Sequence, residues 1–218
     1  MLSRIATPLL LALAFAGCSQ EASVATDAAP TPSAQVPAPE GPLVVFLGDS
    51  LTAGYGLSEQ QAFPALLGAL LPIRVVNAGV SGDTSAGGLR RLPWLLTQHP
   101  DVLVVGLGAN DGLRGLAPTH TEENLRAIVI EARRAGARVL LLGMRLPPNL
   151  GADYIRDFEA VYPRVAKETG VPLVPFFLQG VGGVGALNQE DGIHPTAEGQ
   201  RRVAANVLPY LRTLVERR

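Results

Sequence analysis

The chain has 218 residues, of which 47% are hydrophobic and 17% charged, and this composition supports one sizeable globular core. Because the formal net charge is only −1, the sequence indicates no basic face, and we expect no nucleic-acid partner. A single cysteine excludes an internal disulfide and a cysteine-rich metal site, and three histidines argue against a multi-histidine cage. A site of one histidine with carboxylates stays open, but we expect neither metal nor cofactor.

The N-terminal segment has the pattern of an export signal. Arg4 precedes an apolar stretch, residues 5–16, which has the size of a signal-peptide core and is too short to span a bilayer. Small residues then lead into Cys18, an arrangement that resembles a bacterial lipoprotein signal, although Phe15 stands where such signals usually have Leu. The resemblance implies that residues 1–17 are removed as a signal peptide and that the Cys18 sulfur carries a diacylglycerol. An ordinary secretory peptide with an incidental cysteine is the alternative.

The expected location follows from this lipid anchor. Two or more acyl chains hold a protein stably at a membrane, whereas one chain does not. Ser19 follows the cysteine, and by the same resemblance an Asp at that place would favour the inner membrane. We therefore expect an exported protein on the periplasmic face of the cell envelope, as an outer-membrane lipoprotein.

Residues 18–42 are the cysteine and a segment rich in Ala, Pro, Ser and Thr that contains no aromatic residue. Such a segment buries too little surface to offset the entropy lost on ordering, so we expect a disordered tether. One folded domain is then expected over residues 43–218.

Short, continuously apolar runs alternate with helical patterns from residue 43 onward. The expected strands are 43–47, 73–76, 102–107, 139–144 and 173–177, and the expected helices are 60–71, 84–98, 121–135, 154–168 and 196–212. Continuous apolar runs are typical of parallel strands that helices cover on both faces. We therefore predict an α/β fold class, a three-layer α/β/α sandwich around a five-stranded parallel sheet.

Four polar, glycine-rich blocks follow the expected strands, at the edge of the sheet where sites form in such folds. The blocks are Gly48–Leu51, Asn77–Asp83, Gly108–Gly112 and Asp191–Pro195. Together they offer a hydroxyl, glycine amides, a side-chain amide, a carboxylate and an imidazole. These are the groups that acyl transfer needs.

The roles within the blocks follow from this chemistry. A serine hydroxyl such as that of Ser50 needs an adjacent base, and His194 is the one histidine that lies in such a block. Asp191, three residues earlier, can fix the imidazole tautomer across a turn. The candidate oxyanion donors are the N–H groups of Ser50 and Gly82 and the side-chain amide of Asn110.

In this order, the four blocks resemble the SGNH (GDSL) hydrolase family. The stretches 81–85, 110–115, 145–149 and 166–177 look like its bacterial thioesterase/arylesterase/lysophospholipase branch. The resemblance implies a flavodoxin-like sheet of strand order 2-1-3-4-5 and a shallow site without a metal. It also implies a catalytic set of Ser50, Asp191 and His194, with Gly82 and Asn110 in the oxyanion hole. Gly79 is an alternative to Gly82.

The sequence predicts a serine esterase with a small-molecule or lipid ester as substrate. Leu113, Arg114, Leu146 and Pro147 follow the expected third and fourth strands, and we expect them to line an acyl groove, which the resemblance supports. A membrane-tethered enzyme with such a groove suits aryl esters, acyl esters and lysophospholipids. Thioesters of the cytosol fit less well with export.

Two other functions are considered. The first is a carbohydrate O-acetyl esterase of the cell envelope, although aromatic residues make up only 5% of the chain and no aromatic-rich sugar platform is evident. The second is a non-catalytic envelope binding lipoprotein on a degenerate scaffold, against which the intact set of polar residues speaks.

Two competing motifs carry less weight. The run 180–185 matches G-x-G-x-x-G, but no helix opens there and no strand follows, so we expect a flexible loop near the active site. No serine lies in G-x-S-x-G, which excludes the nucleophile elbow of α/β-hydrolases.

Overall fold

The structure is a computed structural model that describes residues 41–216. The predicted signal peptide, Cys18 and residues 18–40 of the predicted tether lie outside the described residues. None of the described helices is both long and apolar enough to cross a bilayer.

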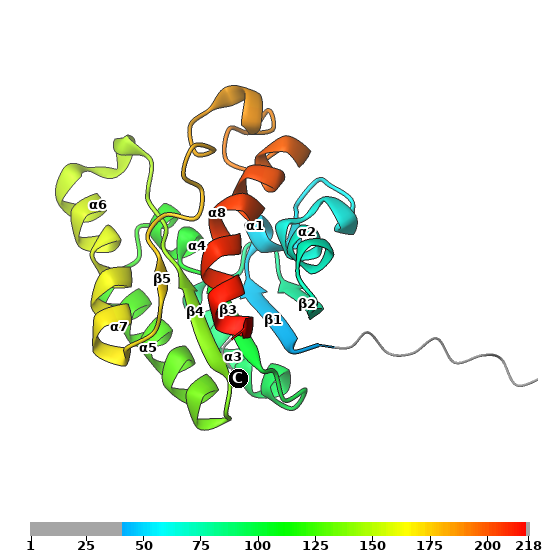
Figure 1. The fold of residues 1–218 in the computed structure, drawn as a ribbon. Helices are drawn as coiled ribbons and strands as arrows, with labels where there is room; N and C mark the ends of the chain where they lie inside the picture. Colours follow the sequence, from blue (N-terminus) through cyan, green and yellow to red (C-terminus); the bar gives the residue numbers. More distant parts are fainter. Residues whose placement is uncertain (1–40, 217–218) are drawn as a thin grey trace, which may run out of the picture. The chain divides into compact units, whose positions relative to one another are not determined.

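A five-stranded parallel sheet organises the described residues, with strand order β2-β1-β3-β4-β5 (Figure 1). Its strands are β1 (Leu43–Gly48), β2 (Arg74–Gly79), β3 (Val102–Gly106), β4 (Arg138–Leu142) and β5 (Leu173–Val174). In the centre of the sheet, Val45 of β1 pairs with Val76 on one side and Leu103 on the other. The predicted α/β fold class and the strand order are confirmed.

Helices cover both faces of the sheet. Their bounds are α1 (Ser50–Ala53), α2 (Phe63–Leu70), α3 (Ser85–Leu96), α4 (Ala109–Leu113), α5 (Pro118–Arg134), α6 (Ala152–Glu159), α7 (Val161–Thr169) and α8 (Ala197–Glu216). Helices α2 and α8 pack together on one face, and α3, α5 and α7 pack side by side on the other (Figure 1). This is the predicted three-layer sandwich.

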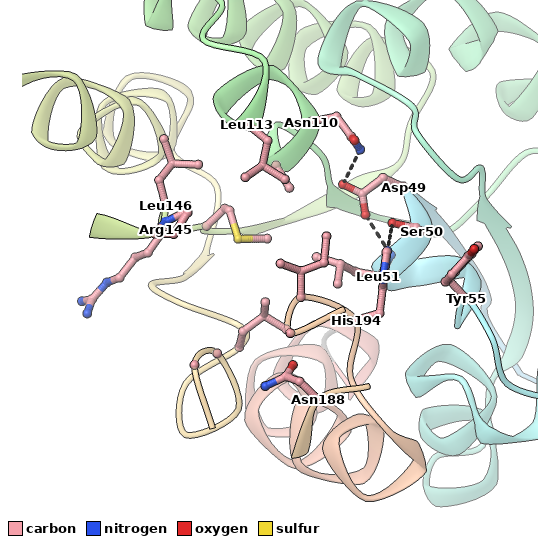
Figure 2. Close-up of a pocket in the computed structure, with 18 of the residues that line it drawn as sticks. Asp49, Ser50, Leu51, Tyr55, Asn110, Leu113, Arg145, Leu146, Asn188 and His194 are labelled. Carbon is pink, nitrogen blue, oxygen red and sulfur yellow. Dashed lines mark hydrogen bonds between the residues drawn. The ribbon is translucent and has the colours of Figure 1, made fainter. Parts of the chain in front are cut away.

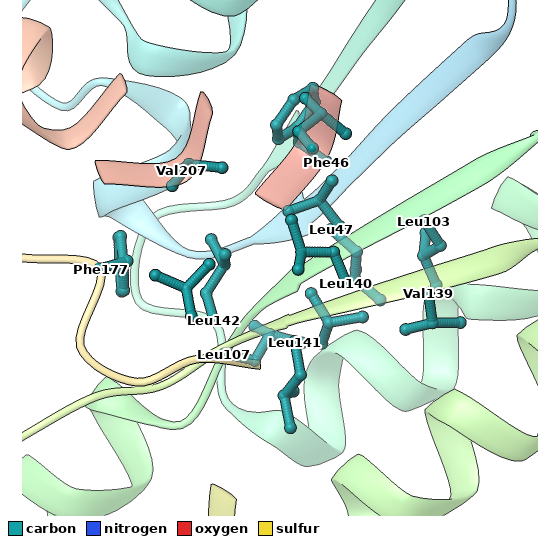
Figure 3. Close-up of a cluster of buried hydrophobic side chains, with 14 of the residues drawn as sticks. Phe46, Leu47, Leu103, Leu107, Val139, Leu140, Leu141, Leu142, Phe177 and Val207 are labelled. Atoms are coloured by element: carbon teal, nitrogen blue, oxygen red, sulfur yellow. The ribbon is translucent and has the colours of Figure 1, made fainter. Parts of the chain in front are cut away.

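The central strands are buried on both sides, as their continuous apolar sequences predict. All six residues of β1 and all five of β3 are buried. Figure 3 shows Phe46 and Leu140 among the side chains that pack between the sheet and the helices. Phe46 also contacts Phe63 of α2 edge-to-face, with ring centroids 5.6 Å apart. The core therefore holds the carboxyl ends of the strands in fixed positions.

The fifth strand is shorter than predicted, because it spans Leu173–Val174 instead of 173–177. Pro175 follows, and a proline has no N–H to donate to a neighbouring strand. Beyond it the chain keeps only single backbone bonds to the end of β4, such as the one from the Phe177 N–H to the Gly143 carbonyl. The residues after Leu142 and Val174 therefore no longer belong to the regular hydrogen-bonded sheet.

The predicted helix over 154–168 is divided into α6 and α7. Pro163 lies in the first turn of α7, and its ring is incompatible with a helical carbonyl four residues earlier, at Glu159. Helix α6 ends at that residue. The prediction of one continuous helix was therefore wrong, because it gave no weight to Pro163.

Other helix boundaries moved by a few residues for similar reasons. Helix α5 begins at Pro118 instead of Thr121, because proline is well suited to a first helical position. The predicted helix over 60–71 became a 3₁₀ turn at Glu59–Gln61 followed by α2, in which Pro64 occupies the first turn. Helix α8 continues through Pro209 to Glu216.

Candidate active site

A pocket of about 610 Å³ opens at the carboxyl ends of the strands. Its lining includes residues from the loops after β1, β2, β3, β4 and β5 (Figure 2). This is the edge of the sheet where parallel α/β folds place their sites, and the four polar blocks of the sequence meet there.

Ser50 is the first residue of α1, and Asp49 alone separates it from the end of β1. Asp49 caps this short helix, because its Oδ1 accepts a hydrogen bond from the Leu51 N–H at 3.0 Å. The close approach of α1 to β2 depends on Gly79, where a Cβ atom would lie 2.2 Å from the Ala53 nitrogen. The strand–helix corner therefore presents the Ser50 hydroxyl at the pocket wall.

His194 reaches Ser50 from a loop 144 residues further along the chain. Its Nε2 lies 2.8 Å from the Ser50 Oγ (Figure 2), and its Nδ1 lies 2.6 Å from Asp191 Oδ2. Asp191 Oδ1 also accepts the backbone N–H groups of Ile193 and His194, each at 3.0 Å. The structure thus joins the three predicted residues in one hydrogen-bonded series.

These hydrogen bonds fix the charge state of Asp191. The N–H and the imidazole of His194 and the N–H of Ile193 favour the ionised carboxylate and lower the pKa of Asp191 to about 2. An ionised Asp191 at neutral pH orients the imidazole with Nδ1 as donor, which leaves Nε2 free to accept the Ser50 proton.

Asp49, on the other side of Ser50, has the opposite character. Burial raises the pKa of its carboxyl to about 7, against the lowering effects of the Leu51 N–H and of His194. Its second oxygen lies 3.5 Å from the Asn110 Nδ2 (Figure 2). The burial of Asp49 and its proximity to Asn110 were not evident from the sequence.

The predicted oxyanion donors lie around the same point. Gly82 lines the pocket with a positive φ of 77°, a conformation that favours glycine. The alternative, Gly79, belongs to β2 and donates its N–H to the Asn77 side chain. The Gly82 N–H has no acceptor within residues 41–216. Its geometry is therefore more suitable for an oxyanion than that of Gly79.

Asn110 lies in the first turn of α4 and also lines the pocket. Its Nδ2 donates to the Asp83 carbonyl at 2.9 Å, in the loop that carries Gly82. The next residue, Asp111, is buried and accepts both the N–H and the hydroxyl of Ser85, at 2.8 and 2.5 Å. Asn110 thus binds α4 to the loop after β2, and Asp111 binds α4 to the start of α3, so the two candidate donors are held at a fixed separation.

The rest of the pocket is mainly apolar. Leu113, Leu146 and Pro147 line it, as the sequence predicts for an acyl groove. Arg114 does not line the pocket, because its guanidinium donates to the Gly82 carbonyl at 2.8 Å. A substrate-binding role for these four residues stays a prediction.

Several lining residues were missed by the sequence reasoning. They are Tyr55, Met144, Arg145, Phe176, Leu178, Asn188 and Ile193. Met144, Arg145 and Phe176 lie two or three residues after the observed ends of β4 and β5. Sites in parallel α/β folds form at the carboxyl ends of the strands, so the position of these residues in the sequence is the signal that could have identified them. The ring of Tyr55 lies 4.6 Å from that of His194, a contact for which the sequence offers no signal.

The glycine-rich run 180–185 forms turns next to the pocket, and Gly182 and Gly183 line it. Asn188 holds this run, because its Nδ2 donates to the carbonyls of Val181 and Val184. Within the described part of the chain, no three His, Cys, Asp or Glu side chains are arranged to hold a metal ion.

Comparison with known proteins agrees with this geometry. Residues 46–202 match the GDSL-like Lipase/Acylhydrolase family. The chain is 50% identical over 178 residues to Esterase TesA of Pseudomonas aeruginosa, covering 79% of this chain and 89% of that one. It is 47% identical over 175 residues to Thioesterase 1/protease 1/lysophospholipase L1 of Escherichia coli K12, covering 79% and 84%.

The fold comparison gives the same result. The crystal structure of a protein named TesA superposes with a TM-score of 0.77 at 50% sequence identity, covering 79% of this chain and 99% of that one. A family match over residues 46–202 and relatives of 47% to 50% sequence identity are sufficient evidence of family membership. The chain therefore belongs to the GDSL-like lipase/acylhydrolase family, the SGNH hydrolases, and within it to the branch of these two relatives.

Proposed function

We propose that this family member is a serine esterase that hydrolyses carboxylic esters through an acyl-enzyme on Ser50. The observation that carries the proposal is the hydrogen-bonded series from Ser50 through His194 to Asp191, with contacts of 2.8 and 2.6 Å. A serine hydroxyl is a weak nucleophile until such a base removes its proton. The same series disfavours a non-catalytic scaffold, because a binding protein has no need of it.

In the proposed reaction, His194 Nε2 takes the Ser50 proton while Oγ attacks the ester carbonyl. The N–H groups of Ser50 and Gly82 and the Asn110 amide stabilise the resulting oxyanion. His194 then gives its proton to the leaving alcohol or thiol. A water molecule, with His194 again as base, attacks the acyl-enzyme and releases the acid and free Ser50.

The proposed substrates are acyl esters, aryl esters and lysophospholipids, with thioesters as a further class. An apolar groove of about 610 Å³ beside Ser50 can accept an acyl chain, and Leu113 and Leu146 line it. The relatives named as esterase, thioesterase and lysophospholipase support this range. No feature of the pocket favours a sugar ester.

The test is the Ser50→Ala variant with p-nitrophenyl acetate as substrate, because this short aryl ester makes little demand on the groove. We expect turnover to fall to the background rate with an unchanged melting temperature, and labelling by a fluorophosphonate to disappear. Ser81→Ala is the matched control, since Ser81 also lines the pocket but is not bonded to His194. Retained activity in Ser50→Ala contradicts the proposal.

We also propose that Cys18 carries a lipid that holds the enzyme at the periplasmic face of the outer membrane. The support is the sequence pattern alone, an apolar stretch that ends at the single cysteine of the chain. Radioactive palmitate should label the wild-type chain but not Cys18→Ala. An unlabelled wild-type chain contradicts the lipid anchor, and a periplasmic enzyme without a membrane tether then replaces it.

A further inference from the structure

The mouth of the pocket is surrounded by exposed apolar side chains. Six of them lie at the carboxyl edge of the sheet, five outside the named helices and strands and one at the end of α4, and we call these six the apolar rim: Tyr55, Val80, Leu113, Leu116, Val184 and Ile193. Their exposed fractions range from 41% to 52%. Large apolar side chains that are exposed together at one place, instead of scattered over the surface, indicate an interaction site.

The rim continues the lining of the pocket. Tyr55, Leu113 and Ile193 themselves line it, and Val80 and Val184 are chain neighbours of the lining residues Ser81 and Gly183. Leu116 belongs to the turn after α4, where its N–H donates to the Asp111 carbonyl. Three rim residues thus belong to the wall of the groove, and the other three lie within three residues along the chain from a lining residue.

Exposed apolar side chains elsewhere among the described residues have a different distribution. Leu70, Trp94, Ile130 and Tyr210 lie singly in the C-terminal halves of α2, α3, α5 and α8. These helices run back against the strands, so their C-terminal halves lie toward the opposite edge of the sheet (Figure 1). The gathering of such side chains is thus specific to the catalytic face.

We propose that the apolar rim docks the enzyme on the surface of a phospholipid layer, so that lipid esters enter the groove directly from the layer. The three residues that rim and groove share are the reason for this occupant, because they offer an acyl chain an apolar path from the layer into the pocket. The inference rests on the proposed esterase function and adds the physical state of the substrate to it.

The charges on this face favour insertion of side chains over electrostatic attraction. Arg114 and Arg145 have no carboxylate partner within residues 41–216, since Arg114 binds the Gly82 carbonyl and Arg145 lies over the Phe176 ring. Glu190 and Asp191 are exposed on the loop that carries His194 and offset these two cations. Binding should therefore persist on zwitterionic phosphatidylcholine and should change little with salt.

The experiment places charges at two rim residues that lie outside the pocket lining. The rim variant is Leu116→Glu with Val184→Glu, and neither residue lines the pocket. The control variant is Leu70→Glu with Trp94→Glu, which places the same charges at apolar positions on the remote edge that are still more exposed than the two rim positions. All chains carry Cys18→Ala and share the rest of the N-terminal segment, so its contribution is common to them.

Two rates and one partition coefficient are measured for each chain. The rates use p-nitrophenyl acetate in solution and lysophosphatidylcholine carried in phosphatidylcholine vesicles, and the partition coefficient comes from sedimentation with the same vesicles. We expect the rim variant to keep its rate on the soluble ester within about twofold. Its vesicle partitioning and its rate on vesicle-borne lipid should fall about tenfold or more, since two side chains lose their apolar burial.

Other outcomes overturn the docking proposal. Unchanged hydrolysis of the vesicle-borne lipid by the rim variant, or an equal loss in the control variant, contradicts a specific docking surface. Loss of vesicle binding between 0.1 and 1 M NaCl contradicts insertion. An equal loss on both substrates assigns the rim to catalysis or folding. Failure of the parent chain to hydrolyse p-nitrophenyl acetate at all instead refutes the esterase function, so the two proposals fail in distinguishable ways.

Discussion

Two regions contribute to the site, and they hold their functional groups in different ways. The nucleophile corner, residues 48–52, follows a fully buried strand, and Asp49 in it is only 1% exposed. Arg91 donates to the Gly48 carbonyl and Asn77 donates to the Thr52 carbonyl, so this corner is bound to two neighbouring elements. The histidine loop, residues 188–196, lies at the surface, and the side chain of Asp191 is 39% exposed.

The difference shows that burial positions the nucleophile, whereas local hydrogen bonds position the base. In the histidine loop, one carboxylate accepts two backbone N–H groups and the imidazole of its own turn, and its pKa falls. In the nucleophile corner, desolvation raises the pKa of the other carboxyl. The following variants test this contrast, from the largest expected effect to the smallest.

Asp191→Asn should produce the largest effect in the histidine loop. The amide no longer favours the tautomer in which Nδ1 donates, and kcat for a soluble ester should fall on the order of 10³- to 10⁴-fold. Steady-state kinetics measure this, with Asp157→Asn as a control at an exposed carboxylate outside the site. A loss below tenfold means that the loop orients His194 without Asp191.

Asn110→Ala tests the donors beside the nucleophile corner. The variant removes an amide that lines the pocket, and kcat should fall on the order of 10²- to 10³-fold, with little change in KM. A rise in KM at constant kcat instead assigns Asn110 to binding of the ground state. The melting temperature should be recorded, because the variant also loses the hydrogen bond to the Asp83 carbonyl.

The two carboxyl groups predict opposite effects of pH on stability. Asp49 has a raised pKa of about 7, so the folded chain keeps a proton that the unfolded chain loses. The free energy of unfolding should fall as the pH rises from about 4 to about 7, by up to about 1.4 kcal/mol per pH unit. Asp49→Asn removes this slope, and chemical denaturation across that range measures it.

Asp191 has a lowered pKa of about 2, so its contribution to stability has the other sign. It is present above pH 4 and is lost as the pH falls from about 4 to about 2. Asp191→Asn should therefore flatten the acid limb of the profile and leave the range from 4 to 7 unchanged. Identical profiles for the two variants contradict the contrast between the regions.

Gln189→Ala should have the smallest effect. The Gln189 amide donates to the carbonyls of Tyr55 and Pro195, and so connects the histidine loop to the chain after the nucleophile corner. Loss of these bonds should lower kcat by about threefold to tenfold, since each contributes a modest net free energy. Glu190→Gln, at the adjacent exposed position, serves as the control and should leave kcat unchanged.

Much of the fold and of the candidate site could be predicted from the sequence. Continuous apolar runs such as 43–47 predict buried parallel strands. Because sites in such folds form at the carboxyl ends of the strands, Ser50, Asn110 and His194 were predicted to lie together at that edge of the sheet, and all three line the pocket. The order of the strands came from the family resemblance instead, because no local pattern encodes which strands become neighbours.

What could not be predicted depends on contacts between distant segments. The burial of Asp49 results from packing around α1. The ring contact between Tyr55 and His194 joins two residues that lie 139 positions apart along the chain, both outside regular secondary structure. Two other features could have been predicted: Pro175 signals the early end of β5, and Pro163 signals the break between α6 and α7. Those errors came from giving hydrophobic periodicity more weight than proline.

The early end of β5 has a consequence for the capacity of the pocket. Met144, Arg145, Phe176 and Leu178 all line the groove, and all lie within four residues of the last residue of β4 or β5. Had the ladder continued past Pro175, these side chains would alternate between the two helical layers instead of facing one cavity. The length of a single edge strand therefore decides whether these residues form a wall of the pocket or pack into the two helical layers.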